Sequence, residues 1–431
     1  MFRASAPGAE IELHPPGEQR YNQDMDLPIR PVTADELPGF LRAEEISFGE
    51  RATPASIEDL SKIFEPDRTL AVHDGERIVA TTAAFSFEVT VPGNRQLPAA
   101  GVTAVGVHAT HRRRGLLTRL MARQLDDVAE RGEPLAILGS SEGGIYGRYG
   151  YGPATFYSKV EVEKVKAQLT GGPEPGRLVL LDKAEAKKLI PPIYDRVRRQ
   201  TPGAISRSDA WWPGLIDDPE HRREGSGERF DVIHERVPGE VDGYVSYRFS
   251  HARESGRRRN VLMVLEVYGL DDQVRTALWR YVLGVDLVDV VHAYCAVDEP
   301  IGWRLTDLRQ WRTVHTGDML WARVLDVPVA LSARTYEVGD RLVLRVEDPF
   351  RPQSGGTFEL EGGPDGAACR PVTAEPDLVL GASQLGSAYL GGVRLATLAR
   401  AGLVTEVTPG ALGRADRMFV TPRAPWCDTD F

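Results

Sequence analysis

The feature that most constrains the fold is the order of two strand-like runs and one helix-like run in residues 102–140. The runs VTAVGV and PLAILGS are short and apolar, as buried strands are. Between them, apolar residues recur every three or four positions, which is typical of an amphipathic helix. These residues are Leu117, Leu120, Met121, Leu125 and Val128. Strand, helix and strand in this order predict a mixed α/β unit.

The same order of runs occurs a second time. VLMVLEVYG, QVRTALWRYVLG and VDVVHAYC are again typical of strand, helix and strand, and the linker-like segment GGPEPG separates the two copies. A third pattern begins near Thr313, and a chain of 431 residues is long enough for several domains. The sequence therefore predicts an α/β (α+β) protein with a flexible leader at residues 1–26 and domains at 27–170, 171–312 and 313–431.

Composition and charge exclude several classes of function. The chain has 52 Lys and Arg against 62 Asp and Glu, a net charge of -10, which argues against a nucleic-acid partner. It has no signal peptide and no apolar run of about 18 residues, so we expect a cytoplasmic protein without a membrane partner. The three cysteines are far apart and indicate neither disulfides nor a metal site; they are Cys295, Cys369 and Cys427.

Against this acidic background, the segment HRRRG is strongly basic. It precedes the first amphipathic helix, where backbone amides and the helix dipole favour anions. Gly115 has no side chain to hold a ligand away from the backbone, so a diphosphate would fit this turn. The GxxxxGK[ST] and GxGxxG patterns of nucleotide sites are absent. The alternative is a solvated basic helix start that binds no ligand.

The second copy differs at the corresponding turn. It places Leu270, Asp271 and Asp272 before its helix, where the first copy has arginines and a glycine. Carboxylates stabilise a helix start but repel a phosphate. We therefore predict that the second copy has lost the ligand site of the first.

Two segments together, VTAVGVHATHRRRGLLTRLM and SSEGGIYGRYGYGPAT, resemble the GNAT superfamily of N-acetyltransferases and, within it, the Enhanced intracellular survival (Eis) family. The superfamily's diphosphate turn, [QR]-x-x-G-x-[AG], is matched from Arg112 onward and departs at Leu117, where the pattern has a small residue. The resemblance implies tandem GNAT folds, the second degenerate, followed by a domain similar to sterol carrier proteins, which the segment QLGSAYLGG matches.

The resemblance also implies an activity: transfer of an acetyl group from acetyl-CoA to primary amines by direct attack on the thioester, without a metal, in a homohexamer. The best-known family members acetylate several amines of one aminoglycoside, an antibiotic-resistance activity; polyamines and lysine side chains are other candidate substrates. By resemblance, the residues that bind acetyl-CoA are Val105, Gly106 and Val107 at the thioester and pantetheine arm, Arg113, Arg114, Gly115, Leu116, Leu117 and Thr118 at the diphosphate, and Ser141 and Glu142 at the cofactor's far side.

Two catalytic groups are also implied by the resemblance. Expulsion of the thiolate needs an acid, and Tyr146 matches the family's general acid; a phenol with a pKa of about 10 stays protonated until the thiolate forms. The terminal Phe431 matches the residue whose α-carboxylate is the family's general base. For Phe431, the alternative is an aromatic tail that docks for oligomer packing only. For the tyrosines of this segment, the alternative is a role as core aromatics, which is the interpretation we favour for Tyr149 and Tyr151.

Acidic side chains indicate a cationic substrate. Glu50 aligns with an acidic pocket position of the family, and Asp428 and Asp430 add negative charge near the C-terminus. An exposed loop carboxylate is the alternative interpretation of Glu50. Where the family has an aromatic beside the pocket, this chain has Ala104. The alternative function is a non-catalytic carrier or regulator that binds CoA or a lipid on the same scaffold.

Overall fold

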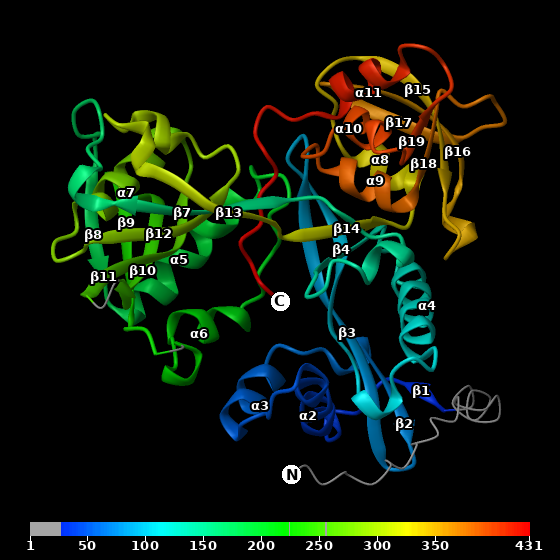
Figure 1. Cartoon of the computed structure of the whole chain (residues 1–431), viewed down its shortest axis with the longest axis horizontal. Coiled ribbons are helices and arrows are strands. Elements are labelled where there is room, and N and C mark those ends of the chain that lie inside the picture. Colours follow the sequence, from blue (N-terminus) through cyan, green and yellow to red (C-terminus); the bar gives the residue numbers. More distant parts are fainter. Residues whose placement is uncertain (1–26, 224, 255–256) are drawn as a thin grey trace, which may run out of the picture.

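The computed structural model describes residues 27–223, 225–254 and 257–431. This part of the chain forms three β-sheets with helices packed against them (Figure 1). The predicted mixed α/β class is therefore confirmed. Among the helices in these ranges, none is long and apolar enough to cross a membrane.

The first sheet has seven strands in the order β1-β2-β3-β4-β5-β14-β6. Its two longest strands come from the apolar runs RIVATTAAFSFEVTV and AAGVTAVGV, whose residues favour a pleated, buried strand. The strands are β1 (Ile29–Arg30), β2 (Thr69–Asp74), β3 (Arg77–Val91), β4 (Arg95–Val107), β5 (Leu135–Gly139), β14 (Leu320–Val324) and β6 (Gly152–Pro153).

Helices cover both faces of this sheet. α4 (Leu116–Glu130) connects the parallel strands β4 and β5, and its Met121 packs with Ala84 and Ala100 on one face. α2 (Leu37–Phe48) packs Phe40 against Ala83 on the opposite face, because neighbouring residues of a strand point to opposite sides. α3 (Pro54–Ser61) lies beside α2. The helix predicted from the period of apolar residues is thus α4.

The second sheet also has seven strands, in the order β13-β7-β12-β11-β10-β9-β8. The predicted second copy of strand, helix and strand is β11, α7 and β12, and β11 pairs in parallel with β12. The elements are β7 (Phe156–Glu163), β8 (Arg177–Leu181), α5 (Lys183–Arg198), α6 (Trp211–Ile216), β9 (Arg229–Val237), β10 (Glu240–Glu254), β11 (Arg257–Gly269), α7 (Asp272–Gly284), β12 (Val290–Ala296) and β13 (Trp311–Asp318).

The two sheets exchange strands. β7 follows the first unit in sequence but pairs with β12 and β13 of the second sheet. β14 follows the second unit but inserts between β5 and β6 of the first sheet. The domain bounds at residues 170 and 312 remain a prediction, and hydrogen-bonded strands cross both of them.

The third unit is a five-stranded sheet in the order β17-β16-β15-β18-β19 with four short helices. Its core is continuous with that of the first sheet, since Leu342 and Leu344 belong to one apolar cluster with Phe85 and Phe87. The elements are α8 (Val327–Ala333), β15 (Asp340–Glu347), β16 (Gly356–Gly363), β17 (Gly366–Pro371), β18 (Leu378–Gly381), α9 (Ala382–Tyr389), α10 (Leu395–Arg400), β19 (Val404–Glu406) and α11 (Ala411–Phe419).

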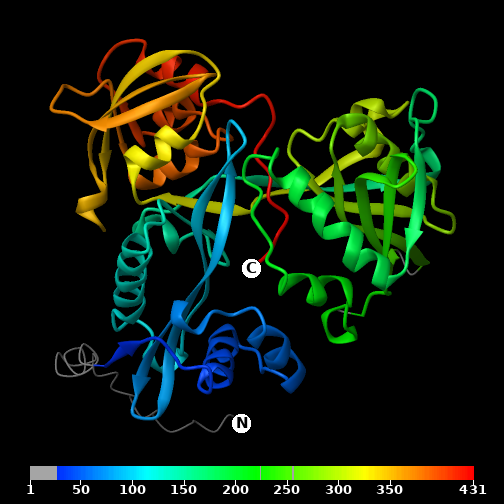
Figure 2. The same ribbon diagram turned by 180° about the vertical axis from the view of Figure 1, so that it is seen from behind.

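The C-terminal segment leaves the third unit after α11 and ends in the centre of the molecule. In Figures 1 and 2 it runs between the second unit and the long strands of the first sheet. Cys427 and Thr429 are buried there, and Phe431 is half-buried. The terminus is therefore docked, as the aromatic composition of the tail predicts.

Candidate active site

The first sheet opens between its parallel strands β4 and β5. The two strands pair from Ala99 with Leu135 to Gly101 with Ile137, and their pairing ends there. β4 continues to Val107 and remains paired with β3 on its other side. In the described part of the chain, the β5-facing edge of β4 after Gly101 therefore offers backbone donors and acceptors to an extended ligand.

A β-bulge lies in this open part of β4. Thr81 pairs with Gly106 and Ala83 with Thr103, so one β3 residue faces two β4 residues, Ala104 and Val105. Ala104 adopts a left-handed conformation with φ 52, and its methyl group is buried against Phe40 of α2. A bulge turns the strand locally and redirects its backbone groups. It lies at the residues predicted to hold the thioester: Val105, Gly106 and Val107.

The open edge leads to the basic turn and the start of α4. Gly115 is the N-cap of this helix, has a left-handed backbone with φ 79, and no side chain caps the helix start. The amides of Leu116, Leu117 and Thr118 therefore have no partner within the helix. Arg113 is exposed beside them, and the guanidinium of Arg114 donates a hydrogen bond to the Thr110 carbonyl at 2.8 Å.

These features fit an acyl-CoA. The open strand edge suits an extended pantetheine arm, and the uncapped helix start with its arginine suits a diphosphate. Ser140 directly follows β5, and its buried Oγ has no hydrogen-bond partner among the described residues. The predicted Ser141 and Glu142 follow it on an exposed loop.

Tyr146 begins the short 3-10 helix η3 (Tyr146–Tyr149) that follows this loop. It is only 5% exposed and packs with Ala100 and Val102 of β4 on the face of the sheet that α4 covers. Burial, and to a smaller extent its neighbours Tyr149 and Glu142, raises the pKa of Tyr146 to about 12. The phenol is therefore neutral at physiological pH and able to donate a proton.

Tyr149 and Tyr151 are core aromatics, as favoured from the sequence. Both are fully buried, and the Tyr149 hydroxyl lies 3.3 Å from Thr118 Oγ1 of α4. Sequence reasoning missed Arg323, a buried residue of β14 that donates to the Tyr149 carbonyl and pairs with Asp348 at 2.6 Å. The exchanged strand thus fixes the turn that holds Tyr146.

Phe431 docks on the opposite face of the same sheet. Its ring meets the Phe87 ring edge to face, with centroids 5.0 Å apart. Gly101 makes room for both rings, because a Cβ added there would lie 2.3 Å from Phe87 and 3.1 Å from Phe431. Gly101 is also the last residue of β4 that pairs with β5. The terminal residue therefore lies where the two strands part.

An acidic group lies on this second face. Glu44, which the sequence did not single out, is half-buried on α2, and burial followed by repulsion from Glu45 and Glu50 raises its pKa to about 7. The last turn of α2 lies against the open part of β4, since a Cβ on Gly106 would meet Ser47 Cβ at 2.6 Å. Glu50 follows this turn and is exposed; Asp430, in the C-terminal tail, is exposed as well.

The helix start of the second unit is capped by the chain's own carboxylates. The Asp271 carboxylate caps α7 by accepting from the Val274 amide at 2.9 Å, and it also pairs with Arg236 at 2.6 Å. Asp272 pairs with Arg423 at 2.9 Å. The loss of the ligand site in this unit stays a prediction.

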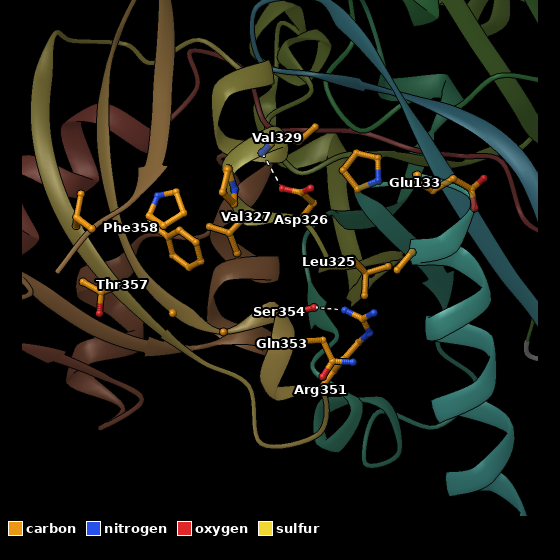
Figure 3. Close-up of a pocket in the computed structure, with 18 residues that line it drawn as sticks. Glu133, Leu325, Asp326, Val327, Val329, Arg351, Gln353, Ser354, Thr357 and Phe358 are labelled. Atoms are coloured by element: carbon orange, nitrogen blue, oxygen red, sulfur yellow. Dashed lines mark hydrogen bonds between the residues drawn. The ribbon is translucent and has the colours of Figure 1, made fainter.

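A cavity of about 570 Å³ lies elsewhere, between the C-terminal end of α4 and the third unit (Figure 3). Its charged lining groups have partners within the protein: Glu133 pairs with Arg68, Asp326 caps α8 at the Val329 amide, and Arg351 bonds Ser354. Neither Tyr146 nor Phe431 lines it. The residues predicted from the sequence to bind acetyl-CoA lie at the strand opening, at the other end of α4.

Comparison with known families gives three successive matches. Residues 28–154 match the acetyltransferase (GNAT) domain, residues 203–324 match a second acetyltransferase (GNAT) domain, and residues 327–428 match the sterol carrier protein domain. The predicted order of two GNAT folds and a sterol-carrier-like domain is confirmed.

Similar proteins extend over nearly the whole chain. An uncharacterized N-acetyltransferase of Streptomyces coelicolor is 39% identical over 94% of this chain and 100% of its own length. N-acetyltransferase Eis of Mycobacterium tuberculosis is 34% identical over 92% of this chain and 98% of its own. The crystal structure of Eis1 from Mycobacterium abscessus superposes with a TM-score of 0.84 at 31% identity, over 94% of this chain and 100% of that one.

Proposed function

Because this chain belongs to the Eis family of GNAT N-acetyltransferases, we propose that it transfers the acetyl group of acetyl-CoA directly to primary amines of cationic substrates. Acetyl transfer that uses acetyl-CoA is the activity of the family. The substrate class and the roles of individual residues are our proposal.

One observation carries the mechanism: two candidate proton-transfer groups flank the strand opening on opposite faces of the sheet. Tyr146 packs on the face covered by α4, at whose start the diphosphate is proposed to bind. Phe431 packs on the other face, beside Phe87. The attacking nitrogen and the leaving sulfur occupy different corners of the tetrahedral intermediate, so a base and an acid at separate positions can act on them.

Tyr146 acts as the general acid in this proposal. Acetyl-CoA supplies an activated acetyl group, held by the backbone of Val105, Gly106 and Val107 with its diphosphate at Arg113, Arg114 and the α4 amides. The Tyr146 phenol, kept neutral by burial, donates its proton to the leaving sulfur. The open edge of β4 offers amides to the developing oxyanion.

The α-carboxylate of Phe431 acts as the general base. An α-carboxyl group has an ordinary pKa of about 3.5, so this one is ionised at neutral pH and can take the proton of the attacking amine directly or through a water. The docked ring holds the terminus beside the opening. Asp430 is the second candidate for this role.

The acidic group on the same face suits a cationic substrate. Glu44, Glu45 and Glu50 bring carboxylates to the side from which the amine is proposed to enter, and Asp430, next to Phe431 in the chain, is a further proposed substrate contact. Polyamines, exposed lysines and aminoglycosides acetylated at several amines are the proposed substrates, and a homohexamer is the proposed assembly. Thiol release from acetyl-CoA across a panel of such amines selects among the substrates.

Tyr146→Phe tests the acid. The substitution keeps the ring and removes the donor, so turnover should fall by about 10² to 10⁴ while acetyl-CoA affinity stays within about twofold. Tyr151→Phe is the matched control, because the Tyr151 hydroxyl is buried without a hydrogen-bond partner among the described residues. A wild-type turnover number for Tyr146→Phe would remove Tyr146 from the mechanism.

A short glycine extension after Phe431 tests the base. It displaces the carboxylate and leaves every side chain in place, so turnover should fall at least about tenfold with acetyl-CoA affinity preserved. If the extended chain turned over like the wild type, the terminal carboxylate would not be the base, and Asp430 would be tested next.

A further inference from the structure

The segment that ends in Phe431 is anchored in the second unit. Thr429 Oγ1 accepts from Arg207 Nη2 at 2.9 Å and from Arg207 Nε at 3.1 Å, and it lies 3.1 Å from the Tyr194 hydroxyl. The Asp428 carboxylate accepts from the Tyr268 hydroxyl and lies 3.7 Å from the Arg207 guanidinium. These polar contacts therefore hold Asp428 and Thr429, the two residues that come before the exposed Asp430 and the terminal Phe431.

Arg207 is held rigidly behind the tail. Its side chain is 2% exposed, and its Nη1 pairs with Glu266 at 2.6 Å. The guanidinium stacks over the Tyr194 ring, 4.0 Å from its centroid, and lies 5.3 Å from that of Trp212. A buried cation needs this much pairing to offset its desolvation, and the result is a fixed donor for the tail.

The same loop is tied to the first sheet. Ser206, next to Arg207, donates its amide to the Glu88 carbonyl at 2.8 Å and accepts from the Glu88 amide through Oγ at 2.9 Å. Glu88 lies on β3 next to Phe87, the residue on which Phe431 packs. The anchor of the tail and the docking point of the terminal ring are therefore linked through the backbone of β3.

We propose that the second GNAT unit, whose own ligand site is closed, positions the catalytic terminus of the first: Arg207, Tyr194 and Tyr268 hold Thr429 and Asp428 so that the Phe431 carboxylate lies at the opening between β4 and β5. The inference rests on the proposed role of that carboxylate. Arg207, Tyr194 and Tyr268 are positioning residues in it and do not touch the reacting atoms. It also gives a use to the degenerate unit.

The test uses the full chain with Thr429→Val and Tyr268→Phe, singly and combined. Both substitutions keep size and remove a hydroxyl, whereas replacing Arg207 would leave Glu266 with a lost partner in a buried place. Tyr244→Phe is the matched control, since Tyr244 stacks on Tyr268 and its buried hydroxyl bonds nothing among the described residues. Thermal melting checks that each variant is folded.

We expect the double variant to lose at least about tenfold in kcat while its acetyl-CoA affinity is unchanged. The loss should shrink as pH rises toward the pKa of the amine, because more of the amine then arrives already deprotonated and one proton fewer has to be removed in the site. Carboxypeptidase should release Phe431 faster from this variant than from the wild type, as mass spectrometry would record. Tyr244→Phe should match the wild type in all three measurements.

Wild-type kcat and a protected terminus in the folded double variant would overturn the inference. The glycine extension separates this failure from failure of the proposed function. If the extension abolishes turnover and the double variant does not, the terminal carboxylate is still supported as the base, and the positioning role of the second unit is contradicted. If the extension has no effect, both the role of the carboxylate and this inference are contradicted.

Discussion

In the proposed site, Gly115 is the residue on which binding of acetyl-CoA most directly depends. Its left-handed backbone starts α4, and a side chain there would lie where the diphosphate is proposed to meet the helix amides. Gly115→Asp adds strain and a like charge, so acetyl-CoA affinity should drop at least tenfold, about 1.4 kcal/mol. Isothermal titration calorimetry measures this.

The control for that substitution lies at the other end of the same helix. Gly132 also has a left-handed backbone, with φ 75, and open space around it. Gly132→Asp thus adds the same charge and a comparable strain, far from the proposed diphosphate. Equal affinities for the two variants would contradict the assignment of the basic turn.

Glu44 predicts a pH dependence of substrate binding. Its pKa is raised from an ordinary 4.5 to about 7, so the carboxyl is mostly neutral below that pH and ionised above it. A bis-quaternary ammonium compound, whose charge does not titrate, should therefore bind more tightly as pH rises through about 7, by about fivefold for an interaction of about 1 kcal/mol. Competitive inhibition measures the affinity.

Glu44→Gln should abolish this dependence, and Glu76→Gln, an exposed carboxylate in the turn between β2 and β3, should keep it. An affinity that does not change between about pH 6 and pH 8 in the wild type would exclude Glu44 from the substrate site.

At the site, single residues were predictable where a local pattern marks them. The basic turn and the GGIYGRYGYG segment are local, and Tyr146 and Gly115 lie where the patterns suggest. Arg207 and Arg323 have no such pattern, because each acquires its place through contacts with segments distant in sequence. Glu44 was missed because its burial, the main cause of its raised pKa, depends on the folded structure.

At the scale of elements, the contrast between α4 and α7 predicts how many acetyl-CoA molecules bind to each chain. The start of α4 has no side-chain cap, whereas at the start of α7 the Asp271 carboxylate already accepts a hydrogen bond from the Val274 amide. We therefore expect equilibrium binding to saturate at one acetyl-CoA per chain, measured by calorimetry with an independently determined protein concentration. Two sites per chain would contradict the proposed loss of the second site.

The same elements show how far periodicity reaches. Apolar spacing of three to four predicted α4, the helix-like run QVRTALWRYVLG predicted α7, and short apolar runs predicted β4, β5, β11 and β12. The exchange of β7 and β14 was not predictable in this way, since strand partners depend on long-range pairing and not on the pattern of either strand. The bulge at Ala104 was hidden for the same reason.

At the scale of the whole molecule, the exchanged strands make the first unit dependent on the second. A fragment of residues 27–154 spans the first GNAT match but lacks β14, whose residues are all buried and pair with β5. We expect the fragment to aggregate and to bind no acetyl-CoA, as light scattering and calorimetry would show.

The matched control is the complete chain cut at an exposed loop, between Gly171 and Gly172, with both pieces expressed together. Both sheets can then be completed, and binding should persist. A monomeric 27–154 fragment with full affinity for acetyl-CoA would show that β14 is dispensable.

The docked terminus has a consequence for the order in which the protein is made. In the proposed mechanism the base is the α-carboxylate of Phe431, and the carboxyl group of a chain's last residue becomes free only when synthesis ends. Every nascent chain still attached to its tRNA has its last carboxyl group tied up in an ester, so it holds no free terminal carboxylate however well its sheets have formed. In that mechanism the enzyme gains its base only with the hydrolysis that terminates translation, and a tag fused after Phe431 would remove the free carboxylate.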